Sequence, residues 1–167
     1  AWDLDHTPSV CTSCSQGCNI DLHTRDNLVQ RLKPRENLDV NGWWMCDEGR
    51  HNYEWINKGD RIEAPLVRDS GTAKAVGWKD ALTGLLAAAG ALDGAKIMAV
   101  ASPLASNEDL GAFTGLVEAL GGGDTVYRSA RAESEVVLKG FPTLARRKDL
   151  AANVHGADLV GATRVGG

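Results

Sequence analysis

Apolar and polar positions alternate in the first part of the chain, as they do in strands that are buried on one face. The clearest case is the run Cys-Asn-Ile-Asp-Leu-His over residues 18–23. Together with residues 10–11 and 28–32, this run predicts three short strands that form a meander. Asp26 and Asn27 supply the turn between the last two strands, because both side chains favour turn conformations.

A polar loop and a short helix are predicted to follow these strands. The loop covers residues 34–42, which contain proline, two asparagines and glycine, and the helix covers residues 47–56. Residues 69–77 are small and polar, so they predict a linker or an exposed hairpin. A first unit over residues 1–68 is therefore expected, and it is too small to be stable through an apolar core alone.

The periodicity becomes helical in the second part of the chain. The apolar side chains on one face of the first predicted helix are Trp78, Ala81, Leu82, Leu85, Leu86 and Ala89. Residues 97–101 form a continuous apolar run, which predicts a strand buried on both faces. Ser106 is a good N-cap for a second helix, which is expected to end at the three glycines of residues 121–123. Residues 125–128 predict a further strand.

This alternation of helices and strands predicts an α/β fold with a parallel sheet. Two strands do not complete such a sheet, so residues 69–167 are expected to form a partial α/β domain that is incomplete. The fold class expected for the whole chain is α/β, with a small, β-rich, cysteine-organised head domain followed by this partial domain.

Composition narrows the function only slightly. The chain has 167 residues, is 43% hydrophobic and carries a formal net charge of -4, so it lacks the basic surface expected of a nucleic-acid partner. Its longest apolar stretches are too short to span a bilayer. No signal peptide is visible, but the sequence begins with Ala1 rather than Met, so this observation says little about targeting.

The four cysteines are the most informative feature of the chain. Cys11, Cys14, Cys18 and Cys46 follow the pattern C-x2-C-x3-C-x27-C, and no other cysteine is present. Four thiolates are the ligand count of a [4Fe–4S] cluster or of a structural zinc ion. The spacing favours a cluster, because structural zinc sites usually combine two C-x2-C pairs. Disulfides are disfavoured, since bridges among the first three cysteines would close cramped loops.

Residues near the cysteines are candidates for supporting roles. Arg50 is a candidate hydrogen-bond donor to the cluster, and Trp44 is a candidate shield against water; an ordinary surface arginine and an ordinary packing tryptophan are the alternatives. His6, His23, His51 and His155 lack ligand spacing with one another, so each is expected to be solvated or loosely bonded; only His6, which is near Cys11 in sequence, is considered as a ligand. We predict no catalytic residue, because no serine has a base at a recognisable spacing.

The sequence around the cysteines resembles a known family. Residues 7–20 read TPSVCTSCSQGCNI, residues 34–41 read PRENLDVN and residues 44–50 read WMCDEGR. These stretches, with Trp2 before them and residues 101–108 and 146–157 after them, are similar to the large iron–sulfur subunit of bacterial NADH:quinone oxidoreductase. This subunit of respiratory complex I, known as its G subunit, is related to the molybdopterin oxidoreductases.

The resemblance implies one [4Fe–4S] cluster held by the four cysteines, in an electron-transport complex that oxidises NADH, reduces quinone and translocates ions. The cluster of this motif lies off the main electron path of that complex, so a structural role is favoured over electron transfer. The implied partners are other subunits of a multi-subunit oxidoreductase. The implied location is the cytoplasmic face of the inner or plasma membrane, reached through partner subunits and without a membrane span of its own.

One departure from the related enzymes concerns a second cofactor. Molybdopterin enzymes commonly place a lysine two residues after the fourth cysteine, where this chain has Glu48. A carboxylate there opposes a second anionic cofactor, so a molybdopterin is not expected. Two alternatives stay open: the N-terminal part of a molybdopterin-dependent formate dehydrogenase-like enzyme, and an interaction module stapled by zinc.

Overall fold

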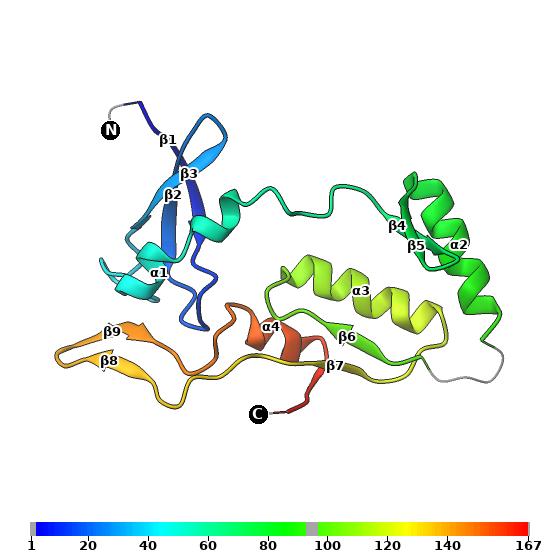
Figure 1. Ribbon diagram of the computed structural model, residues 1–167. Helices are drawn as coiled ribbons and strands as arrows, with labels where there is room; N and C mark the ends of the chain where they lie inside the picture. The colour runs from blue at the N-terminus through cyan, green and yellow to red at the C-terminus, as the bar shows by residue number, and fades with distance from the viewer. Residues whose placement is uncertain (1–2, 93–96, 167) are drawn as a thin grey trace.

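The computed structural model describes residues 3–92 and 97–166, and it shows a chain that mixes β-sheets and helices. Trp2 therefore lies outside the described residues. An antiparallel sheet forms the N-terminal end, and an extended segment leads from it to a hairpin and a helix (Figure 1). The chain then returns through a parallel sheet and a second hairpin, which lies beside the N-terminal sheet. Segments distant in sequence thus meet near the cysteines.

The N-terminal sheet has the predicted meander topology, but its first strand, predicted at residues 10–11, covers residues 5–10 instead. Strands β1 (Asp5–Val10), β2 (Asn19–Arg25) and β3 (Leu28–Pro34) pair antiparallel in the order β1-β2-β3. Asp26 and Asn27 both have positive φ angles, of 52° and 59°, in the two-residue turn between β2 and β3. The buried core of this sheet consists of Cys11, Cys18, Ile20, Val29, Leu32 and Met45. Two of the cysteines are therefore part of the small apolar core itself.

The single helix predicted over residues 47–56 was wrong in its extent. Helix α1 covers only Asp47–His51, and a 3-10 turn, η1, follows over Glu54–Asn57. The break lies at Asn52, whose ψ angle of 65° is not helical. The side chain of Asn57 holds the 3-10 turn to β3 through two 2.8 Å hydrogen bonds, because it donates to the carbonyl of Val29 and accepts from its N–H.

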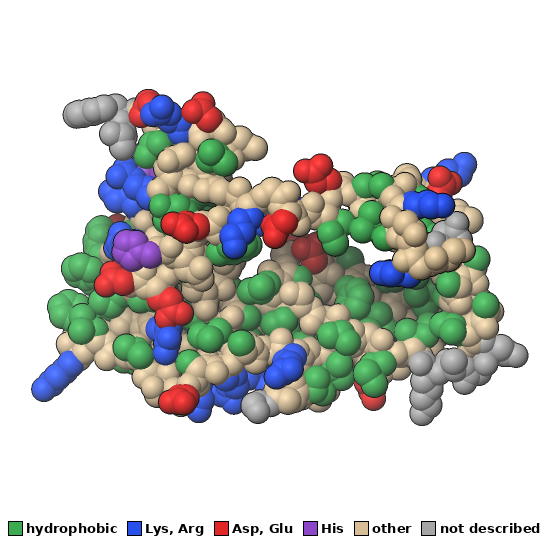
Figure 2. Space-filling view, in the orientation of Figure 1, with side chains coloured by type: hydrophobic (Ala, Val, Ile, Leu, Met, Phe, Trp, Pro, Cys, Tyr) green, Lys and Arg blue, Asp and Glu red, His purple; other side chains and the backbone are tan. Residues whose placement is uncertain are grey.

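Residues 66–75 confirm the exposed-hairpin alternative for the polar segment. Strands β4 (Leu66–Asp69) and β5 (Thr72–Ala75) pair antiparallel, so the predicted boundary after residue 68 falls inside β4. Helix α2 (Trp78–Gly90) follows, and none of its described residues is buried. Trp78 is 73% exposed, and Figure 2 shows hydrophobic side chains at the surface over several parts of the molecule.

A three-stranded parallel sheet forms the α/β part. Strands β6 (Ala99–Ala101), β7 (Thr125–Tyr127) and β10 (Thr163–Arg164) lie in the order β10-β7-β6. The sequence predicted only the first two, because β10 is two residues long and has no apolar run. The prediction that residues 97–101 are buried on both faces was also wrong, since Val100 is 67% exposed between the buried alanines of β6.

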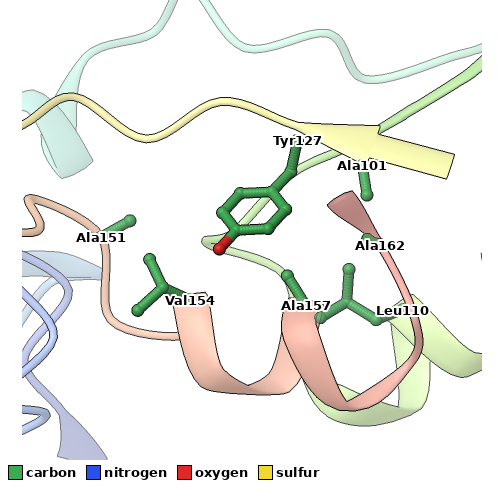
Figure 3. Close-up of a cluster of buried hydrophobic side chains, with 7 residues drawn as sticks. All are labelled: Ala101, Leu110, Tyr127, Ala151, Val154, Ala157 and Ala162. Atoms are coloured by element: carbon green, nitrogen blue, oxygen red, sulfur yellow. The ribbon is translucent and has the colours of Figure 1, made fainter. Parts of the chain in front are cut away.

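The core of the α/β part lies between this sheet and two helices, α3 (Asn107–Ala119) and α4 (Val154–Leu159). Helix α3 begins at the predicted cap, Ser106, and ends at Gly121, whose positive φ angle of 70° completes a Schellman-type turn. The buried side chains, shown in Figure 3, are Ala101, Leu110, Tyr127, Ala151, Val154, Ala157 and Ala162. Most of them are small, so helix α4 packs closely against the sheet.

The second hairpin connects the α/β part to the cysteine region. It consists of β8 (Val136–Leu138) and β9 (Phe141–Arg146), which the sequence analysis did not predict. In Figure 1 this hairpin runs below α1, near the loop that joins β1 and β2. Phe141 packs edge-on against Trp44, with ring centroids 5.7 Å apart. Among the described residues, no helix is long and apolar enough to cross a membrane.

Candidate iron–sulfur site

Three cysteines lie in the loop between β1 and β2. Cys11 directly follows β1 and Cys18 directly precedes β2, and the N–H of Cys11 donates to the carbonyl of Cys18 over 2.8 Å. This bond closes the loop at its base. Gly17 has a φ angle of 61°, a left-handed conformation that glycine adopts at little cost, and its N–H donates to the carbonyl of Cys14. The loop therefore turns tightly between its second and third cysteines.

The fourth cysteine lies at the beginning of α1. Cys46 is the N-cap residue of this helix, and its Sγ accepts the N–H of Gly49 over 3.4 Å. A sulfur in this position satisfies one of the free N–H groups of the first helical turn. The short helix thus fixes the direction of the fourth thiol, which the sequence alone did not specify.

Gly49 fills the space between the first and the fourth cysteine. It is buried, and a Cβ atom at this position would lie 2.9 Å from Sγ of Cys11 and 3.7 Å from Sγ of Cys46. The first distance is too short for a non-bonded contact, so only glycine leaves room for Sγ of Cys11 in this position. Gly49 belongs to the motif of residues 44–50, but its role is not visible in the sequence, because a close approach between distant segments leaves no local signal.

A buried asparagine joins the two cysteine-bearing segments. Asn41 is completely buried, and its side-chain oxygen accepts the N–H of Asn19, the residue after Cys18. Its side-chain nitrogen donates to the carbonyl of Arg35 and to the carbonyl of Trp44, two residues before Cys46. The three hydrogen bonds satisfy this amide and fix the relative position of both segments.

The thiols are protected from water. Cys11, Cys14 and Cys18 are buried, Cys46 is half-buried, and all four are free cysteines. Burial, together with repulsion from the other three cysteines, raises the pKa of the Cys18 thiol to about 12. Burial also raises the pKa of Cys11, against hydrogen bonds from Ser13 that lower it. The unligated thiols of Cys11 and Cys18 are therefore protonated at neutral pH. A metal that binds them has to displace these protons.

These features fit an iron–sulfur cluster. The donor set is four thiols that interact electrostatically with one another, the surroundings are apolar, and Gly49, which has no side chain, lies beside two of the sulfurs. Cysteine thiolates are the standard ligands of such clusters. Among residues 3–92 and 97–166, no three histidine, cysteine, aspartate or glutamate side chains form a group that could hold a metal ion in this conformation.

A segment from the far end of the chain completes the surroundings of the cysteines. We call residues 146–149, which begin with the last residue of β9, the closing segment. The N–H of Arg147 donates to Sγ of Cys14 over 3.4 Å, and the carbonyl of Asp149 accepts the N–H of Ser15 over 2.8 Å. The Nε atom of Arg147 donates to the side chain of Gln16 over 2.6 Å. No local pattern in the sequence indicated this proximity.

The closing segment also contacts the helix that carries the fourth cysteine. The guanidinium of Arg146 forms an ion pair of 2.9 Å with Glu48, two residues after Cys46. The negative charge of Glu48 is therefore offset by a cation from the same chain. The argument against a second anionic cofactor considered the charge of Glu48 alone. Because Arg146 neutralises that charge, Glu48 repels an anionic cofactor less than the sequence indicated.

The two predicted supporting residues lie close to the cysteines in sequence. Arg50 is half-buried in α1, and its side chain lines a surface pocket with Arg31, Lys33 and Tyr53. Trp44 is 46% exposed and packs against Phe141. Neither structure nor sequence assigns them a contact with a cluster, so their roles stay predictions.

The histidine expectations need one correction. His23 was expected to be solvated or loosely bonded, but it is buried, and its Nδ1 atom accepts the Nε–H of Arg31 over 3.0 Å. Its ring stacks on His6 across the β1–β2 pair, with a centroid distance of 3.9 Å. Alternation along β2 places His23 on the face opposite to Ile20, the other buried residue of this strand, and there it contacts His6 and Arg31.

Comparison with known proteins agrees with the cysteine pattern. Residues 4–58 match the molybdopterin oxidoreductase Fe4S4 domain. This span contains all four cysteines, Gly49 and Asn41. The chain is thus an α/β protein with a region at its N-terminal end that matches an iron–sulfur domain.

Several curated proteins are similar over most of the chain. The NADH-quinone oxidoreductase G subunit of Pseudomonas fluorescens is 39% identical over 119 residues, which cover 71% of the chain. The corresponding protein of Salmonella typhimurium is 34% identical over 135 residues, or 80% of the chain. NADH-quinone oxidoreductase subunit 3 of Thermus thermophilus is 37% identical over 84 residues, or 50% of the chain. The resemblance predicted from the motifs is confirmed.

The matched region is a small part of these relatives. It covers 12% of the Pseudomonas protein, 14% of the Salmonella protein and 11% of the Thermus protein. The chain therefore spans much less than two thirds of the length of the proteins that it resembles. In the Salmonella match, the similarity extends beyond the iron–sulfur domain into the α/β part, since 135 aligned residues exceed that domain.

Proposed function

We propose that Cys11, Cys14, Cys18 and Cys46 bind one [4Fe–4S] cluster. The observation that carries this proposal is that Sγ of Cys11 and Sγ of Cys46, the helix N-cap, both lie beside Gly49, while Cys14 and Cys18 are buried in the same loop as Cys11. When bound, such a cluster accepts and donates single electrons. The residues of the chain exclude water from it, direct the four sulfurs and supply N–H donors to two of them.

We further propose that the chain is the cluster-binding part of a large iron–sulfur subunit in an NADH:quinone oxidoreductase complex. The names of its relatives and the match to the Fe4S4 domain support this assignment. Its partners would be other subunits of the complex, at the cytoplasmic face of the membrane. The NADH and quinone chemistry belongs to the assembly, since no catalytic residue is proposed on this chain.

Within the chain, we propose that residues 1–68 form the cluster-binding head and residues 69–167 a partial α/β domain. The last ordered element that packs against the head sheet, η1, ends at Asn57. We favour a structural role for the cluster, because Cys11 and Cys18 belong to a core that contains only four other buried side chains. A ligated cluster stabilises such a small unit directly.

The proposal is tested by metal analysis of the anaerobically purified chain. We expect about four iron and about four acid-labile sulfide atoms per chain, with an EPR signal after reduction. The Cys46→Ser variant should lose most of the iron. Zinc without iron or sulfide would overturn the proposal and favour the zinc-stapled interaction module.

A molybdopterin-dependent formate dehydrogenase-like enzyme is the second candidate. It is favoured by the name of the matching domain, and by the Glu48–Arg146 pair, which offsets the carboxylate charge. Analysis of the full-length polypeptide for molybdenum, tungsten and pterin decides between the two candidates. We expect iron alone, and stoichiometric molybdenum or tungsten would instead identify the enzyme.

A further inference from the structure

The closing segment is held in place by the α/β part of the molecule. The carboxylate of Asp149 accepts a 2.6 Å hydrogen bond from Arg164 of β10 and forms a 3.1 Å ion pair with Arg131. The backbone of Lys148 accepts the N–H of Ala132, and the N–H of Leu150 donates to Ala130. These bonds position the segment from the side opposite the cysteines, independently of any metal.

The contacts of the segment with the cysteine loop follow one another along the backbone. The N–H of Arg147 reaches Sγ of Cys14, and the carbonyl of Asp149 receives the N–H of Ser15. The side chain of Gln16 accepts from Arg147 and donates in turn to the carbonyl of Val40. The loop that carries three of the four thiols is therefore fastened at adjacent residues to the closing segment.

Arg146 adds a positive charge next to the same site. Its NH1 atom pairs with Glu48, whereas its Nε atom is buried and has no hydrogen-bond partner among the described residues. A buried N–H without a partner is costly unless an acceptor is supplied. The sulfur atoms of a bound cluster are acceptors of this kind, and the next residue, Arg147, already donates its N–H to Sγ of Cys14.

From these contacts we propose that the closing segment is a positioning element for the cluster, which raises its reduction potential and slows its loss. This inference rests on the proposed cluster and adds a determinant outside the matched domain, which ends at residue 58. An N–H donor to a ligating sulfur stabilises the more negative, reduced state, so it raises the potential. Contacts outside the ligand shell also orient the ligands and change metal retention.

The test removes the N–H donor without removing a ligand. Arg147→Pro deletes the hydrogen bond to Cys14, and Arg147→Ala is the matched control, because it keeps the N–H and loses only the contacts of the side chain. Both variants are prepared as the full chain of 167 residues. The midpoint potential is measured by an EPR-monitored redox titration, and cluster loss is followed by absorbance after a chelator is added.

We expect Arg147→Pro to have a lower midpoint potential than the parent chain and to lose its cluster about tenfold to a hundredfold faster. Arg147→Ala should keep the parent potential. A proline variant with the parent potential and the parent rate of loss would overturn the inference, and so would an equal fall in potential in both variants.

A second variant decides the case if Arg147→Pro does not fold. Arg164→Gln, made together with Arg131→Gln, removes both side-chain anchors of Asp149 without changing a residue of the cysteine loop. It should also accelerate cluster loss, and an unchanged rate would overturn the inference. A parent chain that contains no iron or sulfide would instead defeat the proposed function, so the two failures are distinguishable.

Discussion

A methyl group on Gly49 would lie 2.9 Å from Sγ of Cys11. Non-bonded carbon and sulfur atoms do not approach so closely, and the thiol is buried, so it has little room to move. Glycine is therefore the only residue type that fits at position 49 while Sγ of Cys11 keeps its position.

We predict that Gly49→Ala displaces Cys11 or α1 and lowers iron content. Overpacking of this kind costs about 1–3 kcal/mol, and we expect a clear loss of cluster absorbance per chain. Gly59→Ala is the matched control, because no atom lies within 4 Å of a Cβ built there. Full iron content in Gly49→Ala would show that the site tolerates the methyl group and would contradict the prediction.

Asn41→Ala should destabilise the head by about 1–3 kcal/mol, which is the usual cost of leaving a buried polar group unsatisfied. The substitution removes the acceptor of the Asn19 N–H and the donor to two carbonyls. Denaturant unfolding monitored by tryptophan fluorescence measures the change. The exposed Asn52→Ala is the control, and an equal effect of both substitutions would refute the specific role of Asn41.

Cys46→Ser should remove or degrade the cluster and lower hydrogen-exchange protection over residues 1–68. The contacts to Cys14 and Ser15 extend this expectation to the Arg147 N–H, which should lose protection together with the loop. Helix α3 packs in the separate core around Leu110 and should keep its protection. Uniform loss over the whole chain, or none over residues 1–68, would contradict this result.

Stability of the head should fall as the pH decreases below about 6.5. Burial, together with electrostatic repulsion from His6, Arg31 and Lys33, lowers the pKa of His23 below the ordinary value of 6.5. In this range the unfolded chain binds a proton that the folded head excludes, so acid favours unfolding. Thermal unfolding between pH 7.5 and 5 measures this dependence.

His23→Gln should weaken that pH dependence, because glutamine does not titrate. His51→Gln changes an exposed histidine and serves as the control, which should follow the parent chain. An unchanged slope in His23→Gln would assign the pH dependence to another group.

The elements that the sequence predicted correctly are those whose conformation is set by neighbouring residues. The β2–β3 turn follows from Asp26 and Asn27, and helix α3 follows from its Ser106 cap and its glycine end. The second hairpin and β10 were missed because short strands with few alternating residues depend on partners elsewhere in the chain. The burial of Val100 was predicted wrongly for a related reason. A run of apolar residues does not indicate whether one face or both faces of the strand are covered by other elements.

The candidate site shows the same division. The cysteine spacing indicated the ligand set, and Gly49 and Asn41 were present in the motifs, but their roles depend on contacts between segments. The contact between Arg147 and Cys14 joins residues 133 positions apart, so no local pattern contains it. Pairing of Glu48 with Arg146 was likewise invisible in sequence and changed the interpretation of that carboxylate.

That separation has a consequence for the order of biosynthesis. A ribosome makes the chain from its N-terminus, so Cys14 emerges long before Arg147, 133 residues later. All four thiols are thus available to an assembly factor while the closing segment has not yet been made. A cluster inserted at that stage enters an open site, and the later arrival of residues 146–149 seals it.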